Sequence, residues 1–498
     1  RDRWSMVIQW LPLIPDEMTD KSVSLSLLKA QVYYLQNNFE KIPPILDRIR
    51  NTDQNLTDFE EGFMAYLDCI FCFIDERGDE AIQFAEKALS LIPKEYYRFR
   101  SDEESWLVLS LHLTGKNDLA FQRIAEAIRL MEQPGEPIQL SRYVAQKAFL
   151  NLLNIDFENL RININDFSNI KNLNPYTQTF LDYLKASIHW WSYNPDEVIR
   201  EFDPVIENQY HVEAQLGMDA YIAKAISLQE LGRTEDAKQL MDQALKEVEE
   251  TGIEENLALI RSGFARLAIL HGDTQAAENH ISTMQNPGIN PFILFWIEVP
   301  AFTICRVKIA LGSSSELKEA LKLLSDYREK VETWNNRLRI VEIASLQAAA
   351  RFKLGEKENA LKDLKYAIEN AAPSKLMRPF VELGSHIKEL LITLKDQRIE
   401  AVFVDSIIDS ISVKGHPKEV LPEYSSDKDK FISQSELDEQ LSPREQDILV
   451  HVSSGLRNKE IANKLYVSTD TIKKHLYNTF RKLHVNNRIE LVNKAKSM

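Results

Sequence analysis

"GRTEDAKQLMDQAL", residues 232–245, contains a glycine, an alanine five residues later and a second alanine seven residues after the first. The same spacing recurs in "GKNDLAFQRIAEAI", residues 115–128, and in "GEKENALKDLKYAI", residues 355–368. Glycine permits the sharp turn that ends one helix, and alanine at the contact points lets neighbouring helices approach closely. The spacing therefore predicts a chain of consecutive helical pairs.

Partial copies extend this pattern along the chain. "RGDEAIQFAEKALSLIP" holds Ala81, Ala88 and a stopping Pro93, and "HGDTQAAENHI" holds Gly272 and Ala277. The pattern resembles the tetratricopeptide repeat, which folds two antiparallel helices in about 34 residues. At that period, residues 24–373 have room for about nine or ten pairs, and no alternating strand pattern lies between them.

Length and composition describe an ordinary globular protein of more than one domain. The chain has 498 residues, 44% of them hydrophobic and 27% charged, and one core seldom fills so long a chain. No apolar run approaches the roughly 18 residues that span a bilayer, and "RDRWSMVIQW" lacks the apolar stretch of a signal peptide. We therefore expect a cytoplasmic protein with no membrane partner. Because residue 1 is arginine, we also expect a fragment or a processed product.

Two features that suggest redox, metal or nucleotide chemistry have simpler explanations. Cys69 and Cys72 have the spacing of a redox or zinc motif, but four-ligand zinc needs further Cys or His, so we expect buried apolar cysteines. The nearest match to a phosphate-binding loop, "SLHLTGKND", has Ser110 and Asn117 at the positions where glycine and Ser or Thr are needed. The sequence predicts no enzyme activity, no metal and no cofactor in this chain.

A solenoid of helical pairs has a concave face that can bind ligands. Aromatic residues in two stretches are candidates for lining it, namely Trp190, Trp191, Tyr193 and Trp296. One hypothesis is a groove for a small molecule or a peptide. The alternative is that these side chains pack between helices, because large apolar side chains are mostly buried.

The charge of the chain changes near its end. Residues 441–498 contain 11 Lys and Arg against five Asp and Glu, whereas the rest contains 49 against 70. A local basic patch indicates a polyanionic partner better than the net charge of −15 does. The stretch before it, residues 412–440, is rich in charge and serine and has the composition of a linker.

The basic tail has the pattern of four short helices. Ser442, Pro443 and Glu445 form a capping box with proline at the first helical position, and Ile448, Leu449 and Val452 share one face. Asn458 can cap a second helix that buries Ile461, Ala462 and Leu465, and Ser468 can cap a third. Lys473, Lys474, Tyr477, Asn478 and Arg481 fall on the polar side or flank of that third helix. Two helices joined by a tight turn, the second polar and basic outward, predict a helix-turn-helix.

Over about 58 residues the tail resembles the LuxR-type DNA-binding domain. The residues that carry this resemblance include Leu441, Ser442, Arg444, Glu445, Gly455, Asn458, Lys459, Glu460, Ile461, Ala462, Leu465, Ser468, Thr471, Lys473, His475, Asn478, Lys482, Leu483, Val485 and Arg488. Asp447 and His484 depart from it, where the family usually has glutamate and glycine. His484 puts the turn before the fourth helix in doubt.

The resemblance also implies functional roles. It places Lys473, Lys474 and Tyr477 at base edges of double-stranded DNA and makes Lys459, Thr469 and Thr471 phosphate contacts. In such domains the fourth helix often pairs two copies, which here would use Ile489 and Val492. The borders "WSMVIQWLPLIPDEM" and "APSKLMRPFVELGSHIKELL" resemble those of the sensor region in MalT-like large LuxR regulators, which carry a signalling ATPase upstream.

These observations predict an all-α protein in two parts. We expect an N-terminal border at residues 1–23, a tetratricopeptide-like solenoid at residues 24–411, a linker at 412–440 and a four-helix LuxR-type domain at 441–498. The favoured function is a sequence-specific transcriptional regulator that senses an unknown small molecule or protein and self-associates on DNA. The alternative is a repeat scaffold for a protein partner, with the basic tail used for localisation.

Overall fold

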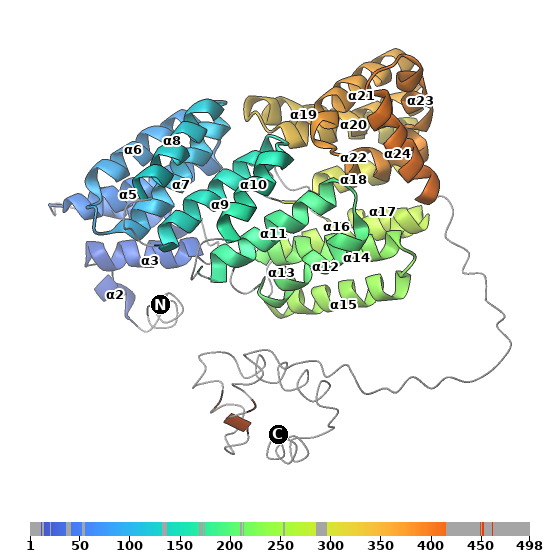
Figure 1. The fold of residues 1–498 in the computed structure, drawn as a ribbon. Coiled ribbons are helices and arrows are strands. Elements are labelled where there is room, and N and C mark those ends of the chain that lie inside the picture. Colours follow the sequence, from blue (N-terminus) through green and yellow to red (C-terminus); the bar gives the residue numbers. More distant parts are fainter. Residues whose placement is uncertain are drawn as a thin grey trace, which may run out of the picture. The chain divides into compact units, whose positions relative to one another are not determined.

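The computed structural model describes residues 11, 14–19, 21–35, 41–51, 55–131, 137–168, 173, 175–209, 212, 214–251, 254–284 and 296–414, together with Leu449, His451, Val452 and Ile461. These residues form helices joined by short turns, and the described part of the chain contains no strand (Figure 1). The all-α prediction is confirmed.

The helices of the first half are α2 (Asp16–Thr19), α3 (Val23–Leu35), α4 (Pro43–Arg50), α5 (Asp58–Ile74), α6 (Gly78–Leu91), α7 (Tyr97–Leu113), α8 (Asn117–Met131), α9 (Pro137–Leu153), α10 (Phe157–Ser168), α11 (Pro175–Trp191), α12 (Pro195–Glu201) and α13 (Asp203–Glu207). Those of the second half are α14 (Ala214–Glu230), α15 (Thr234–Thr251), α16 (Glu254–His271), α17 (Thr274–Ser282), α18 (Pro300–Leu311), α19 (Ser314–Thr333), α20 (Arg337–Lys353), α21 (Lys357–Ala371), α22 (Arg378–Leu383), α23 (Lys388–Asp396) and α24 (Ala401–Lys414). Two 3₁₀ helices, η5 (Ala372–Ser374) and η6 (Gly384–His386), flank α22.

Consecutive helices pair as the repeat predicts. Each longer helix packs against the next one along the chain, as α5 does with α6, α14 with α15 and α20 with α21. At each close contact the conserved spacing places a small side chain: Ala120 and Ala360 are fully buried and Ala237 is 1% exposed. We call the whole set, residues 23–414, the helical array.

A left-handed residue marks the turn inside each pair from α5–α6 to α20–α21, and a buried residue follows it five positions later. Gly115, Gly232 and Gly355 have φ values of 73°, 78° and 85°, which glycine adopts without steric cost. Ile155 and Tyr193 take the same conformation, with φ values of 59° and 60°. These two pairs therefore keep the geometry of the repeat without its glycine.

The pair α5–α6 uses its glycine differently from the other pairs. Its left-handed residue is Glu76, with φ of 62°, and not Gly78. Gly78 serves a close approach instead, because a Cβ there would lie 2.5 Å from Cγ2 of Thr114. Five residues after Glu76, Ala81 is fully buried, so the register matches that of the other pairs.

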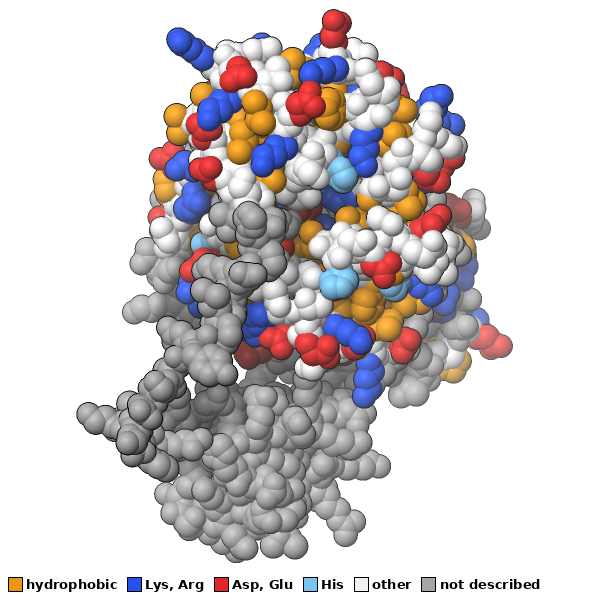
Figure 2. All heavy atoms as spheres, turned by 90° about the vertical axis from the view of Figure 1, so that its right-hand side faces the viewer, with side chains coloured by type: hydrophobic (Ala, Val, Ile, Leu, Met, Phe, Trp, Pro, Cys, Tyr) orange, Lys and Arg blue, Asp and Glu red, His pale blue; other side chains and the backbone are white. Residues whose placement is uncertain are grey.

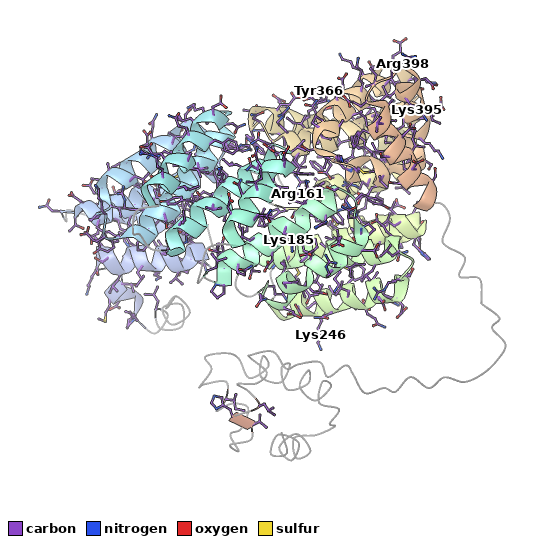
Figure 3. The ribbon with its side chains drawn as sticks, in the orientation of Figure 1. Arg161, Lys185, Lys246, Tyr366, Lys395 and Arg398 are labelled. Carbon is purple, nitrogen blue, oxygen red and sulfur yellow. The ribbon has the colours of Figure 1, made fainter. Side chains whose placement is uncertain are left out.

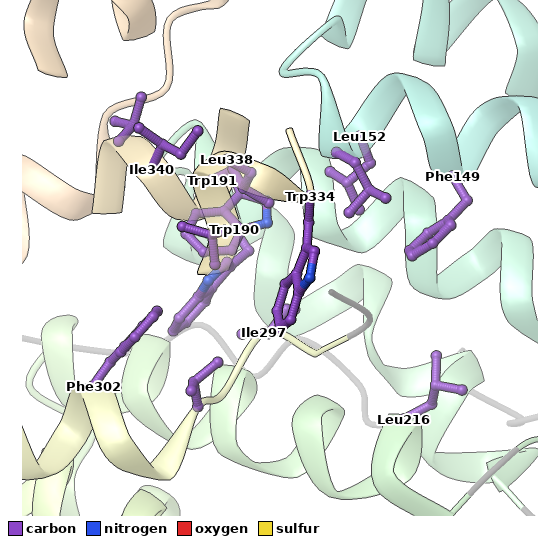
Figure 4. Packing of buried hydrophobic residues seen from close by; sticks show 14 of the residues in the cluster. Phe149, Leu152, Trp190, Trp191, Leu216, Ile297, Phe302, Trp334, Leu338 and Ile340 are labelled. Atoms are coloured by element: carbon purple, nitrogen blue, oxygen red, sulfur yellow. The ribbon is translucent and has the colours of Figure 1, made fainter. Parts of the chain in front are cut away.

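The array folds back on itself. In an ordinary solenoid each repeat contacts only its neighbours, yet α9 contacts α20 and α11 contacts α22. Figure 4 shows Phe149, Leu152, Trp190 and Trp191 of the first half in the same core region as Trp334, Leu338 and Ile340. One continuous core therefore joins the beginning and the end of the array.

The chain divides into two compact units, residues 1–419 and 420–498. The last described helix of the first unit, α24, ends at Lys414, and the division falls within the segment predicted as a linker. In the second unit, Leu449, His451, Val452 and Ile461 are helical, and Val452 and Ile461 are fully buried, as their predicted apolar faces require.

Candidate functional site

A polar groove of about 570 Å³ lies between α19, α20 and α21. Its lining residues are Ser325, Arg328, Glu329, Glu332, Gln347, Arg351, Asn359, Lys362 and Asp363. Arg328 donates to Oε1 of Gln347 at 2.8 Å, and both Arg328 and Arg351 pair with Asp363. Tyr366, labelled in Figure 3, is 39% exposed. The Arg328 guanidinium lies over its ring, 5.4 Å from the ring centre. These groups suit a small polar ligand, and the sequence analysis missed them.

The predicted aromatic groove is wrong for Trp190 and Trp191. Trp190 is 1% exposed and Trp191 is 3% exposed, so neither can line an open face. Both pack between helices of the array (Figure 4). They form an edge-to-face pair with 6.5 Å between their ring centres. The alternative stated from the sequence is the correct one.

Tyr193 and Trp296 also differ from the predicted groove. Tyr193 is the left-handed turn residue between α11 and α12, and its half-buried ring faces Arg378 at 5.0 Å. Trp296 is half-buried and packs against the main core. The structure does not bring the four aromatic residues together at an open surface.

Instead, the region around Trp190 holds a cluster of buried charges, which we call the arginine–glutamate core. Its members are Arg266, Arg306, Arg339, Arg378, Glu230, Glu298, Glu342 and Glu382. None of these side chains is more than 12% exposed. Four positive and four negative charges balance, as buried charges must.

Two arginines of this core lie against Trp190. The Arg378 guanidinium lies 3.6 Å from the centre of a Trp190 ring, and that of Arg266 lies 5.2 Å away. A desolvated cation over an indole face is attracted by the ring quadrupole. Arg339 makes a similar contact with Trp191 at 5.5 Å. The tryptophans therefore help to hold the buried arginines in place.

The charges of the core reinforce one another. Burial alone would raise the pKa of Glu342, but Arg339 and Arg306 lower that pKa below its ordinary value. Burial alone would lower the pKa of Arg266, but Glu382 and Glu298 raise it. Glu342 and Arg266 thus stay ionised inside the protein, and removal of one of their partners leaves a buried charge unpaired.

The cysteines and the described acidic and histidine residues offer no metal site. Cys69, Cys72 and Cys305 are buried and unpaired with one another, and burial raises the pKa of the Cys72 thiol to about 11. Within the described ranges, no group of three or more His, Cys, Asp or Glu is placed to hold a metal ion. Likewise, no helix in those ranges is long and apolar enough to cross a membrane.

The predicted DNA-binding and pairing residues lie outside the described residues. They are Lys459, Ser468, Thr469, Thr471, Lys473, Lys474, Tyr477, Asn478, Arg481, Ile489 and Val492. Their roles remain predictions from the sequence.

Two segments of the chain match known families. Residues 206–397 match the family described as "MalT-like TPR region", and residues 439–495 match "Bacterial regulatory proteins, luxR family". The chain therefore combines a MalT-like TPR region with a luxR-family domain. The MalT-like match covers the repeats at residues 232–245 and 355–368, and the luxR match covers most of the basic tail.

This chain matches curated proteins along almost its whole length, at low identity. It is 24% identical over 513 residues to the HTH-type transcriptional regulator MalT of Vibrio campbellii (strain ATCC BAA-1116), across 95% of this chain and 54% of that protein. It is 22% identical over 541 residues to the protein of the same name from Serratia proteamaculans (strain 568), across 99% of this chain and 56% of that protein. The chain therefore spans about half the length of the curated relatives it matches.

A more distant likeness exists to a solved structure described as a Rap protein complexed with competence and sporulation factor. It has 14% identity and a TM-score of 0.37, and it covers 65% of this chain and 96% of that one.

Proposed function

We propose that this chain is a transcriptional regulator in which the helical array senses an effector and the tail binds a specific DNA sequence. The observation that carries the proposal is the match of residues 439–495 to the luxR family. In that register, we expect Lys473 and Lys474 to lie on the third helix, where a helix-turn-helix approaches base edges and phosphates. The cytoplasm is the compartment that fits this function.

DNA binding can be tested without a known promoter. The full chain would first select sequences from a random duplex pool, and the selected duplex would then be titrated at several salt concentrations. We expect Lys473→Ala with Lys474→Ala to weaken binding and to flatten the salt dependence, because each lysine that neutralises a phosphate adds about 0.9 to the slope.

A control variant distinguishes the loss of a DNA contact from a general loss of positive charge. Lys246 is exposed on α15, far along the chain from the tail (Figure 3). Lys246→Ala removes one positive charge of the same kind and should leave binding unchanged. Equal binding by the double variant and the parent protein would show that the third helix does not contact DNA.

The same titrations address the scaffold hypothesis. A scaffold that uses its basic tail only for localisation would bind all duplexes alike, because phosphate contacts carry no sequence information. A regulator should prefer its selected duplex over a scrambled one by roughly a thousandfold or more.

For sensing, we propose that the polar groove between α19, α20 and α21 takes the effector. Its paired guanidinium and carboxylate groups and the exposed Tyr366 ring offer hydrogen bonds and one stacking surface. On the side shown in Figure 2, charged side chains of both signs are interspersed with hydrophobic ones. A metabolite screen by thermal melting, repeated on Tyr366→Ala, tests the site.

A further inference from the structure

The segment that follows α21 crosses back to much earlier helices. We call residues 372–383, which comprise η5, the turn at Lys375 and α22, the closing strap. Regular pairing stops here: Lys375 is left-handed with φ of 57°, and α22 has only six residues. The strap is therefore a break in the repeat at the place where the array meets its own first half.

The strap binds the C-terminal ends of helices. The amide of Met377 donates to the carbonyl oxygen of Trp191 at 2.9 Å, and Nε of Arg378 donates to that of Trp190 at 2.9 Å. These carbonyls belong to the last turn of α11, which lacks partners within its own helix. A cation placed there also interacts favourably with the helix dipole. The Ser374 hydroxyl makes a similar bond to the carbonyl of Ile155.

Arg378 joins two earlier helices at once. Its guanidinium nitrogens donate to both carboxylate oxygens of Glu230, the last residue of α14, at 3.2 Å and 3.0 Å. The side chains of Arg378 and Glu230 are each 1% exposed. A bidentate pair of this kind has strict geometry, so the position of α22 is tied to the ends of both α11 and α14.

The boundary between the first half of the array and its C-terminal helices, which we call the seam, is weakly held at its outer edge. Lys330 of α19 pairs with Glu76, 254 residues away, and their side chains are 44% and 21% exposed. An exposed ion pair contributes little to stability. The attraction within a buried pair such as Arg378–Glu230 is in turn largely offset by the desolvation of both groups. The charged contacts of the seam can therefore separate without a large penalty, because water can solvate the charges, whereas the buried Phe380 and Val381 of the strap oppose its opening.

We propose that the closing strap is a releasable latch: Arg378 holds the array in a closed turn, and its release lets the first half and the C-terminal helices separate. An effector that favours one of the two forms would then shift their populations. The latch concerns the array alone and holds whether or not the tail binds DNA.

Distance measurements on the full chain test the latch. Spin labels would be placed at Glu80→Cys and Glu329→Cys, which are exposed on either side of the seam, and the three native cysteines are buried. We expect one narrow distance distribution in the parent. Arg378→Met keeps the bulk of the side chain but removes its charge and hydrogen bonds, and should add a second population at longer distance.

Two further variants make the result decisive. Arg233→Met is the matched control, because Arg233 is 54% exposed and its ion pair is with Asp236 of the same turn; it should leave the distribution unchanged. Glu230→Gln weakens the latch more gently and should give a smaller second population. Helical circular dichroism reports whether each variant is folded.

Each outcome counts for or against the latch. A folded Arg378→Met or Glu230→Gln variant with the parent's single distance would overturn the proposal. Loss of helicity in both variants would overturn it too, because the contact would then be required for folding and could not be released. A longer-distance population in a folded variant supports it.

Discussion

Asp219 joins three segments of the array through one fully buried carboxyl group. It accepts hydrogen bonds from the Tyr183 hydroxyl at 2.8 Å and from the amides of Ile297 and Glu298 at 2.7 Å and 2.9 Å. Burial raises the pKa of Asp219 to about 7, although these three bonds favour its ionised form. A single residue thus couples the packing of α11, α14 and the segment before α18 to pH.

This raised pKa predicts a loss of stability as the pH rises. An unfolded aspartate titrates near pH 3.9, so between about pH 4 and pH 7 the folded protein holds a proton that the unfolded chain has released. Stability from this group is greatest at low pH and falls by up to about 1.4 kcal/mol per pH unit across that window.

Urea denaturation of the parent and of Asp219→Asn, each at pH 5 and pH 8, measures the effect. The asparagine variant cannot ionise, so its midpoint should fall less over this interval than that of the parent. Parallel changes in both proteins would show that Asp219 does not titrate in this range.

The small residues of the repeat carry a second prediction at this scale. Ala237 is 1% exposed at a helix contact, and Ala237→Leu should destabilise the array by roughly 1–3 kcal/mol through overpacking. Lys238→Leu adds a similar side chain at the next, exposed position and should change stability little. Denaturation midpoints of the two variants provide the comparison, and equal midpoints would contradict the prediction.

At the scale of the helical pair, the sequence predicted the pairs wherever glycine and alanine mark them. It missed the turns at Ile155 and Tyr193, because a left-handed conformation costs a non-glycine residue only about 1–2 kcal/mol. The buried residues Leu160 and Val198, five positions later, offset that cost with their packing. The five-residue spacing between the turn and a buried residue is therefore a better guide than glycine itself.

Helix starts have their own determinants. Thr57 and Glu60 form a complete capping box at the start of α5, with the Glu60 amide donating to the Thr57 hydroxyl at 3.2 Å and the Thr57 amide donating to Glu60 at 3.0 Å. Thr57→Ala should destabilise the protein by about 1 kcal/mol, with faster amide hydrogen exchange in the first turn of α5.

A threonine in a helix interior is the matched control. Thr393 lies within α23 and bonds back to the Glu389 carbonyl, so Thr393→Ala should be neutral or slightly stabilising, since alanine has the higher helix propensity. If Thr57→Ala and Thr393→Ala behaved alike, the capping box would not stabilise α5.

At the scale of the molecule, the sequence predicted an open solenoid whose aromatic residues were candidates for a groove. It could not predict closure, because contacts such as Arg378 with Trp190 join residues 188 positions apart and follow no local period. Arg339 and Glu342 within the apolar run "RLRIVEIASL" were the available hint, since charges amid apolar residues of a helix must find partners once buried. The tail differs, because its resemblance to the luxR family rests on many residues in one register.

The final prediction concerns how many copies of the chain act together on DNA. A domain of about 58 residues has little surface with which to hold an operator, and specific affinity usually comes from two half-sites bound by a dimer. We therefore expect two chains on a selected duplex with two half-sites, and binding weaker by roughly a hundredfold or more on a single half-site.

Sedimentation measures how many chains associate, and DNA titration measures their affinity. Both would be carried out on the parent and on Val492→Asp, which changes the predicted pairing surface of the fourth helix. That variant should lose the gain from the second half-site, because a buried carboxylate opposes pairing. Val402→Asp is the control, since Val402 is 84% exposed on α24 and should behave like the parent. Adding a screened effector should raise self-association and affinity together if the array acts by gathering copies. Full affinity from a chain that stays monomeric on and off DNA would rule out this mechanism.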